Sequence, residues 1–246
     1  MKQLLAALQF LTILPIRQAF DSKQTGGSLV WFPAAGLVVG VCAAACYGLC
    51  IGLRLPESLA ALAGVLALGG FSGFLHLDGV ADTADGFFSS RSRERTLEIM
   101  RDSRIGTMGA VGVFGVLALK WSALASLPPG MGWRALILGP IVGRAAQVIT
   151  MTWLPYARPE GGLASVFLSH CTRRTAMLNG LAGVVAAGFL SGGKGLIAIC
   201  LAAVFALGFN AWCLKKINGI TGDTLGAVSE GVETIILCAL CAGAGV

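Results

Sequence analysis

Seven apolar stretches of 15 to 25 residues recur along this chain of 246 residues, and they constrain its fold more than any other feature. A helix of about 20 apolar residues crosses the roughly 30 Å hydrocarbon core of a bilayer. The stretches lie at Leu29–Leu53, Glu57–Leu77, Thr107–Leu127, Arg134–Trp153, Ala176–Leu190, Gly195–Leu214 and Val232–Val246. The sequence therefore predicts an all-α, polytopic membrane helix bundle with about seven transmembrane helices. The two shortest stretches, 176–190 and 232–246, leave half-buried helices as an alternative.

The composition excludes an ordinary soluble protein. Hydrophobic residues make up 56% of the chain, charged residues only 12%, and the mean hydropathy is +0.80. A soluble domain carries about a quarter charged residues. The net charge of +6 is modest, and in a membrane protein a basic excess belongs to cytoplasmic loops rather than to a nucleic-acid surface. No soluble domain or long linker interrupts the apolar stretches, so residues 1–246 are expected to form one integral-membrane domain.

The N-terminal run "LLAALQFLTILPI" is too short to span a bilayer comfortably. It has a single flanking lysine and lacks a small-residue cleavage site, so it does not resemble a cleavable signal peptide. An interfacial or half-inserted helix that ends at Pro15 is expected instead.

The connecting segments alternate in chemistry. Long charged segments follow the second, fourth and sixth stretches, near 78–106, 154–175 and 215–231. The connections after the first, third and fifth stretches are short, and their only basic residues are Arg54 and Lys194. Positively charged loops of membrane proteins stay in the cytoplasm. The three long segments are therefore expected to lie together on the cytoplasmic face of the membrane, as the loops of a one-sided active site would.

Three aspartates begin the first of these segments. Asp78, Asp82 and Asp85 have the spacing i, i+4 and i+7, so a helix would present all three carboxylates on one side. Like charges at this spacing repel each other, and a divalent cation would reverse that effect. Mg²⁺ prefers oxygen ligands and is usually held by one or two carboxylates plus substrate phosphates. The pattern predicts a Mg²⁺ site, and a solvated polar helix end is the alternative.

Arginines follow the aspartates. Arg101 and Arg104 flank Asp102 in "RDSRIG". A guanidinium group can donate two parallel hydrogen bonds to phosphate oxygens, so both arginines are candidates for substrate binding, together with Asp102. The earlier arginines of "SRSRER" are expected to contact anionic membrane lipids. Metal-binding carboxylates beside phosphate-binding arginines indicate phosphoryl or nucleotidyl transfer.

Four further polar residues are candidates. Asp223 lies between Thr221 and another threonine in "GITGDTLGA"; it could ligate a metal, orient a water or bond a sugar hydroxyl, or simply cap a helix. We group Thr221 with it as substrate-binding. Arg144 lies within an apolar stretch, where a charge normally faces a polar cavity. For His76, packing and substrate binding are equally supported.

The segment "GGFSGFLHLDGVADTADGFFSSRSRERTLEIMRDSRIGTMGA" strongly resembles the signature of the cobalamin synthase (adenosylcobinamide-GDP ribazoletransferase) family. The similarity extends to "LQFLTILPI", "WFPAAGLVVG", "YARPEGGLASVF" and "NGITGDTLGAVSE", in family order over nearly the whole chain. The acidic motif shows no departure. Asn218 stands where glycine is expected in the last segment.

The resemblance implies a multi-pass inner-membrane enzyme that joins adenosylcobinamide-GDP to α-ribazole, or to its 5′-phosphate, and releases GMP with the help of Mg²⁺. It also implies that the three aspartates of 78–85 hold the metal against the diphosphate and that Asp82 or Asp223 accepts the proton of the attacking hydroxyl. Homo-oligomerisation stays open. The alternatives are another membrane phosphotransferase that uses a nucleotide-activated alcohol, and an ion-coupled transporter, although a transporter would place its acids nearer the middle of the membrane.

Overall fold

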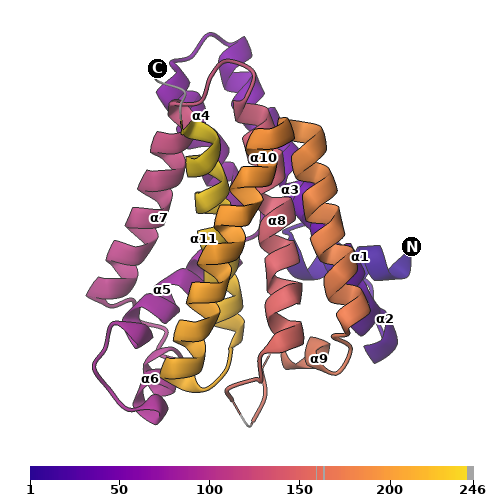
Figure 1. Cartoon of the computed structure of the whole chain (residues 1–246), viewed down its shortest axis with the longest axis vertical. Helices are drawn as coiled ribbons and strands as arrows, with labels where there is room; N and C mark the ends of the chain where they lie inside the picture. Colours follow the sequence, from indigo (N-terminus) through magenta and orange to yellow (C-terminus); the bar gives the residue numbers. More distant parts are fainter. Residues whose placement is uncertain (159, 163, 243–246) are drawn as a thin grey trace.

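The structure is a computed structural model that describes residues 1–158, 160–162 and 164–242. These residues form a bundle of long helices, with shorter helices gathered mainly at one end (Figure 1). The elements are α1 (Lys2–Leu11), α2 (Ser22–Gly27), the 3-10 turn η1 (Ser28–Trp31), α3 (Phe32–Gly52), α4 (Glu57–Phe71), α5 (Leu75–Phe87), α6 (Arg93–Ile99), α7 (Thr107–Ala125), α8 (Gly132–Trp153), α9 (Ser165–Leu168), α10 (Arg173–Ile217) and α11 (Gly222–Cys241). The predicted all-α membrane class is confirmed.

Five helical stretches in the described part of the chain are long and apolar enough to span a membrane, and the bent pair α4–α5 adds a sixth if it counts as one span. The expected number of seven is not confirmed. The difference arises in α10, which contains both predicted stretches, 176–190 and 195–214. At Gly192 the backbone leaves the helical region (φ 55, ψ −138), and in Figure 1 the two arms of α10 meet at this bend and spread apart from it. Glycine adopts this conformation without a steric penalty.

The last helix begins earlier than predicted. The stretch 232–246 was expected to follow a long loop at 215–231, but α10 continues to Ile217 and α11 begins at Gly222. The loop prediction is wrong because only residues 218–221 separate the two helices. Asn218 lies in the left-handed region (φ 55), where asparagine is the usual substitute for glycine after a helix. Residues 243–246 of the predicted stretch lie outside the described residues.

The predicted stretch 57–77 is broken. Helix α4 ends at Phe71, and α5 continues at an angle of 89° to it. Two consecutive residues with positive φ, Gly73 (62°) and Phe74 (56°), make the bend. A left-handed phenylalanine is uncommon and is retained only where the surrounding structure enforces it. The bend turns α5 across one end of the bundle instead of along its axis (Figure 1).

Helix α8 forms the centre of the bundle and contacts α3, α10 and α11 extensively. Its closest neighbour is α3, because a Cβ atom on Gly36 would lie 2.4 Å from the carbonyl oxygen of Pro140, and one on Gly40 2.7 Å from the Cα of Ile137. Small residues four positions apart allow such a close approach of membrane helices. The tight α3–α8 pair gives the fold a rigid frame on which the other helices pack.

Helix α1 is short and packs against α3, η1 and α2. It ends at Leu11, before the expected limit at Pro15, and its ten residues are too few to cross a bilayer. Figure 1 shows α1 beside the lower half of the bundle, close to α2. The N-terminal run is thus a separate short helix, as the sequence predicted.

The charged segments gather at one end of the bundle, where Figure 1 shows α5, α6 and α9 near the start of α11. Arg93 connects α6 to the end of α10 and to the segment after α8, since its guanidinium donates hydrogen bonds to the carbonyl oxygens of Ile217 (2.9 Å) and Ala157 (2.7 Å). This arginine was expected to contact lipid heads; its role here is to tie backbone segments together. The association of the polar segments is therefore built by specific contacts.

Candidate active site

The three aspartates of α5 form an acidic edge. Asp78 is exposed, and Asp82 and Asp85 are half-buried, whereas five of the six residues between Asp78 and Asp85 are buried, Asp82 being the exception. This burial pattern is that of a helix with a single open face, and it confirms the shared face that the spacing predicted. The acidic edge lies at the end of the bundle where the other polar segments meet.

Asp85 connects the acidic edge to α7. Its two carboxylate oxygens accept hydrogen bonds from the backbone N–H groups of Gly106 (2.7 Å) and Gly109 (2.8 Å), at the first turn of α7. The N–H groups of a first turn have no partner within the helix, and a negative charge is stabilised there. A Cβ atom on Gly109 would lie 2.4 Å from the Asp85 carboxylate, so glycine permits the contact.

Asp223 reaches the acidic edge from α11. A Cβ atom on Gly79 would lie 2.5 Å from the carbonyl oxygen of Asp223, and the backbones of α5 and α11 therefore cross in close contact. Thr221, not Asp223, caps α11, because its hydroxyl accepts from the N–H of Thr224 (3.3 Å). Thr221 is fully buried, and its hydroxyl also donates to the Asp223 carboxylate (3.2 Å).

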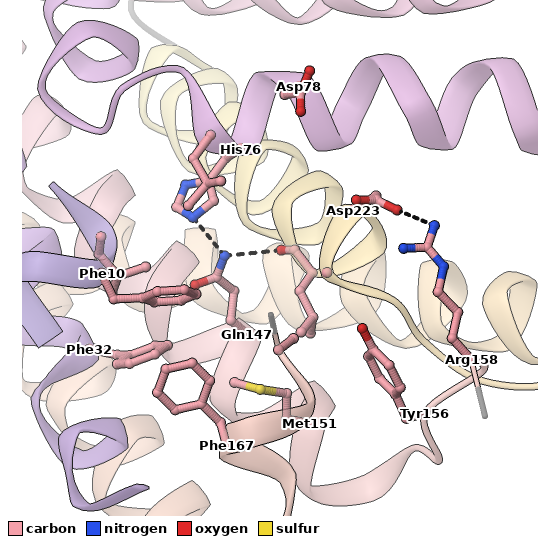
Figure 2. Close-up of a pocket in the computed structure, with 15 residues that line it drawn as sticks. Phe10, Phe32, His76, Asp78, Gln147, Met151, Tyr156, Arg158, Phe167 and Asp223 are labelled. Carbon is pink, nitrogen blue, oxygen red and sulfur yellow. Dashed lines mark hydrogen bonds and ion pairs between the residues drawn. The ribbon is translucent and has the colours of Figure 1, made fainter. Parts of the chain in front are cut away.

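Arg158 pairs with Asp223 at 2.8 Å (Figure 2). A short parallel bridge between Tyr156 and Ile220 holds this contact, with the N–H of Ala157 donating to Ile220 (2.8 Å). The bridge brings the segment after α8 beside the turn before α11. One carboxylate near the acidic edge is thereby neutralised by an arginine from a different segment.

Asp82 lies among the other acids and, within the described residues, accepts no hydrogen bond from a side chain or from the backbone. Its pKa is raised from the ordinary 3.8 to about 7, chiefly by burial and then by the negative charges of Asp223 and Asp78, which the Arg158 cation only partly offsets. A carboxyl group that titrates near neutral pH can exchange a proton or accept a cation in its place. Asp82 is the carboxylate best suited to either role.

The predicted phosphate-binding residues lie beside the acidic edge. Arg101 pairs with Glu160 from the segment after α8, and Arg104 forms two hydrogen bonds with Asp102 (2.6 and 3.0 Å). Arg104 and Asp102 line an open groove of about 400 Å³ together with Asp85. Each arginine already has a carboxylate partner, so an anion would enter by exchange with that partner.

A cavity of about 200 Å³ opens next to Asp78 and Asp223 (Figure 2). Three aromatic rings form one side of it: Phe10 from α1 lies 6.2 Å from Phe32 of α3 and 4.8 Å from Phe167 of α9, measured between ring centroids. The cavity lining consists of Phe10, Leu11, Phe32, Leu75, His76, Asp78, Gln147, Met151, Tyr156, Arg158, Ala164, Phe167, Gly222, Asp223 and Leu225. An apolar cavity with a few polar groups at one edge is the usual form of a small-molecule site.

His76 and Gln147 provide polar atoms within the cavity wall. The Gln147 amide nitrogen donates to Nε2 of His76 (2.9 Å) and to the carbonyl oxygen of Leu225 (3.2 Å) (Figure 2). Because Nε2 accepts, the proton is on Nδ1, which has no partner. His76 was predicted to bind substrate or to pack, and its position allows both.

Arg144 lies away from this cavity. It is 1% exposed and pairs with Glu233 of α11, which also accepts from Lys120 of α7 at 2.7 Å. Lys120 pairs with Glu230 as well, at 2.5 Å. Two cations and two carboxylates thus form a closed, neutral ionic cluster inside the bundle. Substrate binding by Arg144 stays a prediction, and the cluster gives the residue a structural role.

Three residues of the site were not singled out from the sequence. Arg158 looked like one more basic loop residue, Gln147 is a lone amide in an apolar stretch, and Phe10 belongs to an N-terminal run that was assigned to the interface. No local pattern marks them, because each one acquires its role by packing against a distant segment. The resemblance in "YARPEGGLASVF" was the one available signal for Arg158.

Comparison with known sequences shows one consistent family. The family model described as "Cobalamin-5-phosphate synthase" matches residues 3–241. The chain is 42% identical over 245 residues to the adenosylcobinamide-GDP ribazoletransferase of Herpetosiphon aurantiacus, covering 98% of this chain and 96% of that protein. It is 39% identical to the enzyme of the same name from Chlorobaculum parvum, covering 95% and 92%, and 40% identical to that of Roseiflexus sp., covering 95% and 87%. No solved structure matches the chain.

Proposed function

Because this chain belongs to the cobalamin-5-phosphate synthase family, we propose that the acidic edge of α5 is the catalytic centre of a Mg²⁺-dependent adenosylcobinamide-GDP ribazoletransferase. The chain is a multi-pass membrane transferase of cobalamin synthesis, acting at the step that assembles the lower ligand. The observation that carries the assignment of the centre is the free Asp82 carboxylate, which lies among three other acids and has a pKa of about 7.

In the proposed reaction, a ribose hydroxyl of α-ribazole, or of its 5′-phosphate, attacks the phosphorus that is bonded to cobinamide. The new P–O bond forms as the bond to the bridging oxygen breaks, and GMP leaves with that oxygen. The hydroxyl proton passes to a carboxylate. The product is adenosylcobalamin, or its 5′-phosphate. This chemistry needs a proton acceptor near neutral pH and positive charge around the diphosphate.

The donor set suits Mg²⁺. Within the described residues, no three acidic, histidine or cysteine side chains are already arranged as a complete metal site. Mg²⁺ commonly takes only one or two carboxylates and completes its shell with waters and substrate phosphates. Asp78 is exposed, and Asp82 accepts no hydrogen bond within the described residues, so carboxylate oxygens of the kind that Mg²⁺ prefers are open at the acidic edge. We assign Asp78, Asp82 and Asp85 as the residues that would hold it. When bound, the ion supplies positive charge that offsets the charge of the diphosphate and of departing GMP.

The protein's own groups divide the remaining tasks. Arg101 and Arg104 bind the diphosphate by exchanging their carboxylate partners for phosphate oxygens. Asp82 and Asp223 are the two candidates for the proton acceptor. Burial raises the pKa of Asp223 as well, but Asp223 is the weaker candidate, because its carboxylate is already engaged by the ion pair with Arg158 and the hydrogen bond from Thr221, and both favour its charged form.

We propose that the chain lies in a bacterial inner membrane and that its reaction site is on the cytoplasmic side. The charged segments near 78–106 and 154–175 gather at one end of the bundle, together with the turn at 218–221 (Figure 1). The eight arginines of the segments 78–106 and 154–175 support the cytoplasmic orientation. Contact of the remaining exposed arginines with anionic lipid heads, and self-association of the chain, stay predictions.

GMP release from adenosylcobinamide-GDP tests the proposal. Purified protein in detergent is mixed with both substrates, with and without Mg²⁺. The Asp82→Asn variant is expected to lose about 10²–10⁴-fold in turnover, the usual contribution of a positioned acid–base group. Asp21→Asn is the matched control, since Asp21 caps α2 and asparagine caps helices equally well. Near-normal turnover of Asp82→Asn at saturating Mg²⁺ would contradict the assignment.

A further inference from the structure

We propose that the cavity walled by Phe10, Phe32 and Phe167 binds the planar benzimidazole base of the ribazole substrate and directs its ribose toward Asp78 and Asp223. This inference rests on the proposed function, because it assigns one of the two substrates to a part of the same site. It also gives α1, the short N-terminal helix, a direct place in substrate recognition.

The walls of the cavity suit a flat apolar ring system. The centroids of Phe10 and Phe167 are 4.8 Å apart with their rings tilted by 51°, and those of Phe32 and Phe167 are 5.6 Å apart at 73°. Leu11 and Met151 complete the apolar lining. Aromatic walls contribute attraction to another aromatic ring beyond the area they bury. The volume of about 200 Å³ suits one fused bicyclic base, whereas a corrin macrocycle is far too large to enter.

The polar groups of the cavity favour a base with few hydrogen-bonding atoms. His76 is 2% exposed and leaves Nδ1 unpartnered, and Gln147 is 4% exposed and leaves Oε1 unpartnered. Figure 2 shows the Gln147 carboxamide directed toward the Phe10 ring. A benzimidazole nucleoside has one free ring nitrogen, an acceptor to which the His76 Nδ1–H, but not the Gln147 Oε1, can donate. Guanine would bury several donors and acceptors against two partners, and unpaired buried polar groups are costly.

The position of the cavity connects the base to the chemistry. Asp78 lies on α5 above the cavity in Figure 2, and Asp223 and Arg158 lie at its side. Nε of Arg158 is buried and has no hydrogen-bond partner. A nucleoside whose base lies among the phenylalanines therefore extends its ribose toward two carboxylates and an arginine. That arrangement leaves the groove at Arg104 for the diphosphate of the second substrate.

Steady-state kinetics of the full chain in detergent, with both substrates varied, tests this placement. Phe10→Leu and Phe167→Leu keep apolar volume and remove a ring, and each is expected to raise KM for ribazole about tenfold, the equivalent of a lost aromatic contact. KM for adenosylcobinamide-GDP is expected to stay unchanged. Phe209→Leu is the matched control, because Phe209 belongs to a separate aromatic group with Phe87 and Trp212 outside the cavity. It is expected to change neither KM.

Equilibrium dialysis with labelled ribazole, without the second substrate, separates the two proposals. Phe167→Leu enlarges the cavity and Phe167→Trp fills it, and both variants are expected to bind ribazole more weakly. Asp82→Asn is expected to bind ribazole normally. An increase of KM for adenosylcobinamide-GDP alone, or unchanged ribazole binding in both Phe167 variants, would overturn the assignment of the cavity. Absence of GMP release by the wild-type protein that still binds ribazole would overturn the proposed function and leave the cavity assignment standing.

Discussion

The ionic cluster inside the bundle offers a prediction that depends on charge balance. Lys120 and Glu230 are 2% and 4% exposed, and they pair at 2.5 Å, while Glu233 accepts from Lys120 and pairs with Arg144. Lys120→Met leaves two buried carboxylates and one cation. Removal of one partner from a buried ion pair costs about 3–5 kcal/mol, because the other charge stays buried without compensation.

The double variant Lys120→Met/Glu230→Gln is expected to be more stable than Lys120→Met alone. It removes one cation and one anion, so the Arg144–Glu233 pair stays intact and the cluster is neutral again. A well-packed replacement of a complete buried pair is often nearly neutral in stability. The second substitution should therefore recover at least about 2 kcal/mol, within the range of coupling energies between residues in contact.

Thermal unfolding in detergent measures these differences. A loss of 3–5 kcal/mol corresponds to a fall in Tm of roughly 6–20 °C for a chain of this length. Lys194→Met is the control, because Lys194 is exposed near the bend of α10 and its replacement should leave Tm unchanged. If the double variant unfolds at the same temperature as Lys120→Met, or at a lower one, the charges do not act as a balanced set and the reasoning is refuted.

Three further predictions concern the site. The raised pKa of Asp82 means that a proton competes with Mg²⁺ below about pH 7, so the apparent Mg²⁺ affinity should fall up to about tenfold per pH unit as the pH drops from 7 to 5. Without metal, the protein should lose stability as the pH rises from about 4 to 7. Titrations of the protein with and without Mg²⁺ measure both effects. Gly79→Ala should abolish turnover and cost about 1–3 kcal/mol, because its Cβ would collide with the Asp223 backbone, whereas Gly115→Ala, with open space around it, should do neither in the same turnover and melting assays. Arg158→Ala should raise the pH at which activity is half-maximal, because loss of the cation raises the pKa of the neighbouring carboxyl groups; an unchanged pH–rate profile would contradict this.

The acidic edge was predictable because its information is local. The spacing of Asp78, Asp82 and Asp85 alone fixes their common face once the segment is helical, and five of the six residues between Asp78 and Asp85 are buried in the structure. The apolar stretches were predictable for the same reason, since hydropathy is read within one window. The bend between α4 and α5 was not, because Phe74 has no intrinsic preference for a positive φ.

The early start of α11 was missed because its charged residues appear out of place in a membrane helix. Asp223 and Glu230 reduce the apolarity of any window that extends toward the start of α11, so the predicted stretch began only at Val232. The helix starts at Gly222, so Glu230 and Glu233 lie well inside it, and both carboxylates pair with cations inside the bundle. Their partners, Lys120 and Arg144, come from α7 and α8, and no window on α11 contains that information.

The bend in front of α5 keeps the acidic edge against the end of the bundle. If α4 continued straight, the helix from Glu57 to Leu77 would be about 31 Å long, enough to cross the hydrocarbon core, and the three aspartates would extend past the end of the bundle and away from α11. The 89° turn at Gly73 and Phe74 instead lays α5 across the end of the bundle, with its acidic edge open and its other faces buried. The strained turn therefore holds α5 against α11, where a Cβ on Gly79 would lie 2.5 Å from the carbonyl oxygen of Asp223, and straightening it would separate the three aspartates of α5 from Asp223.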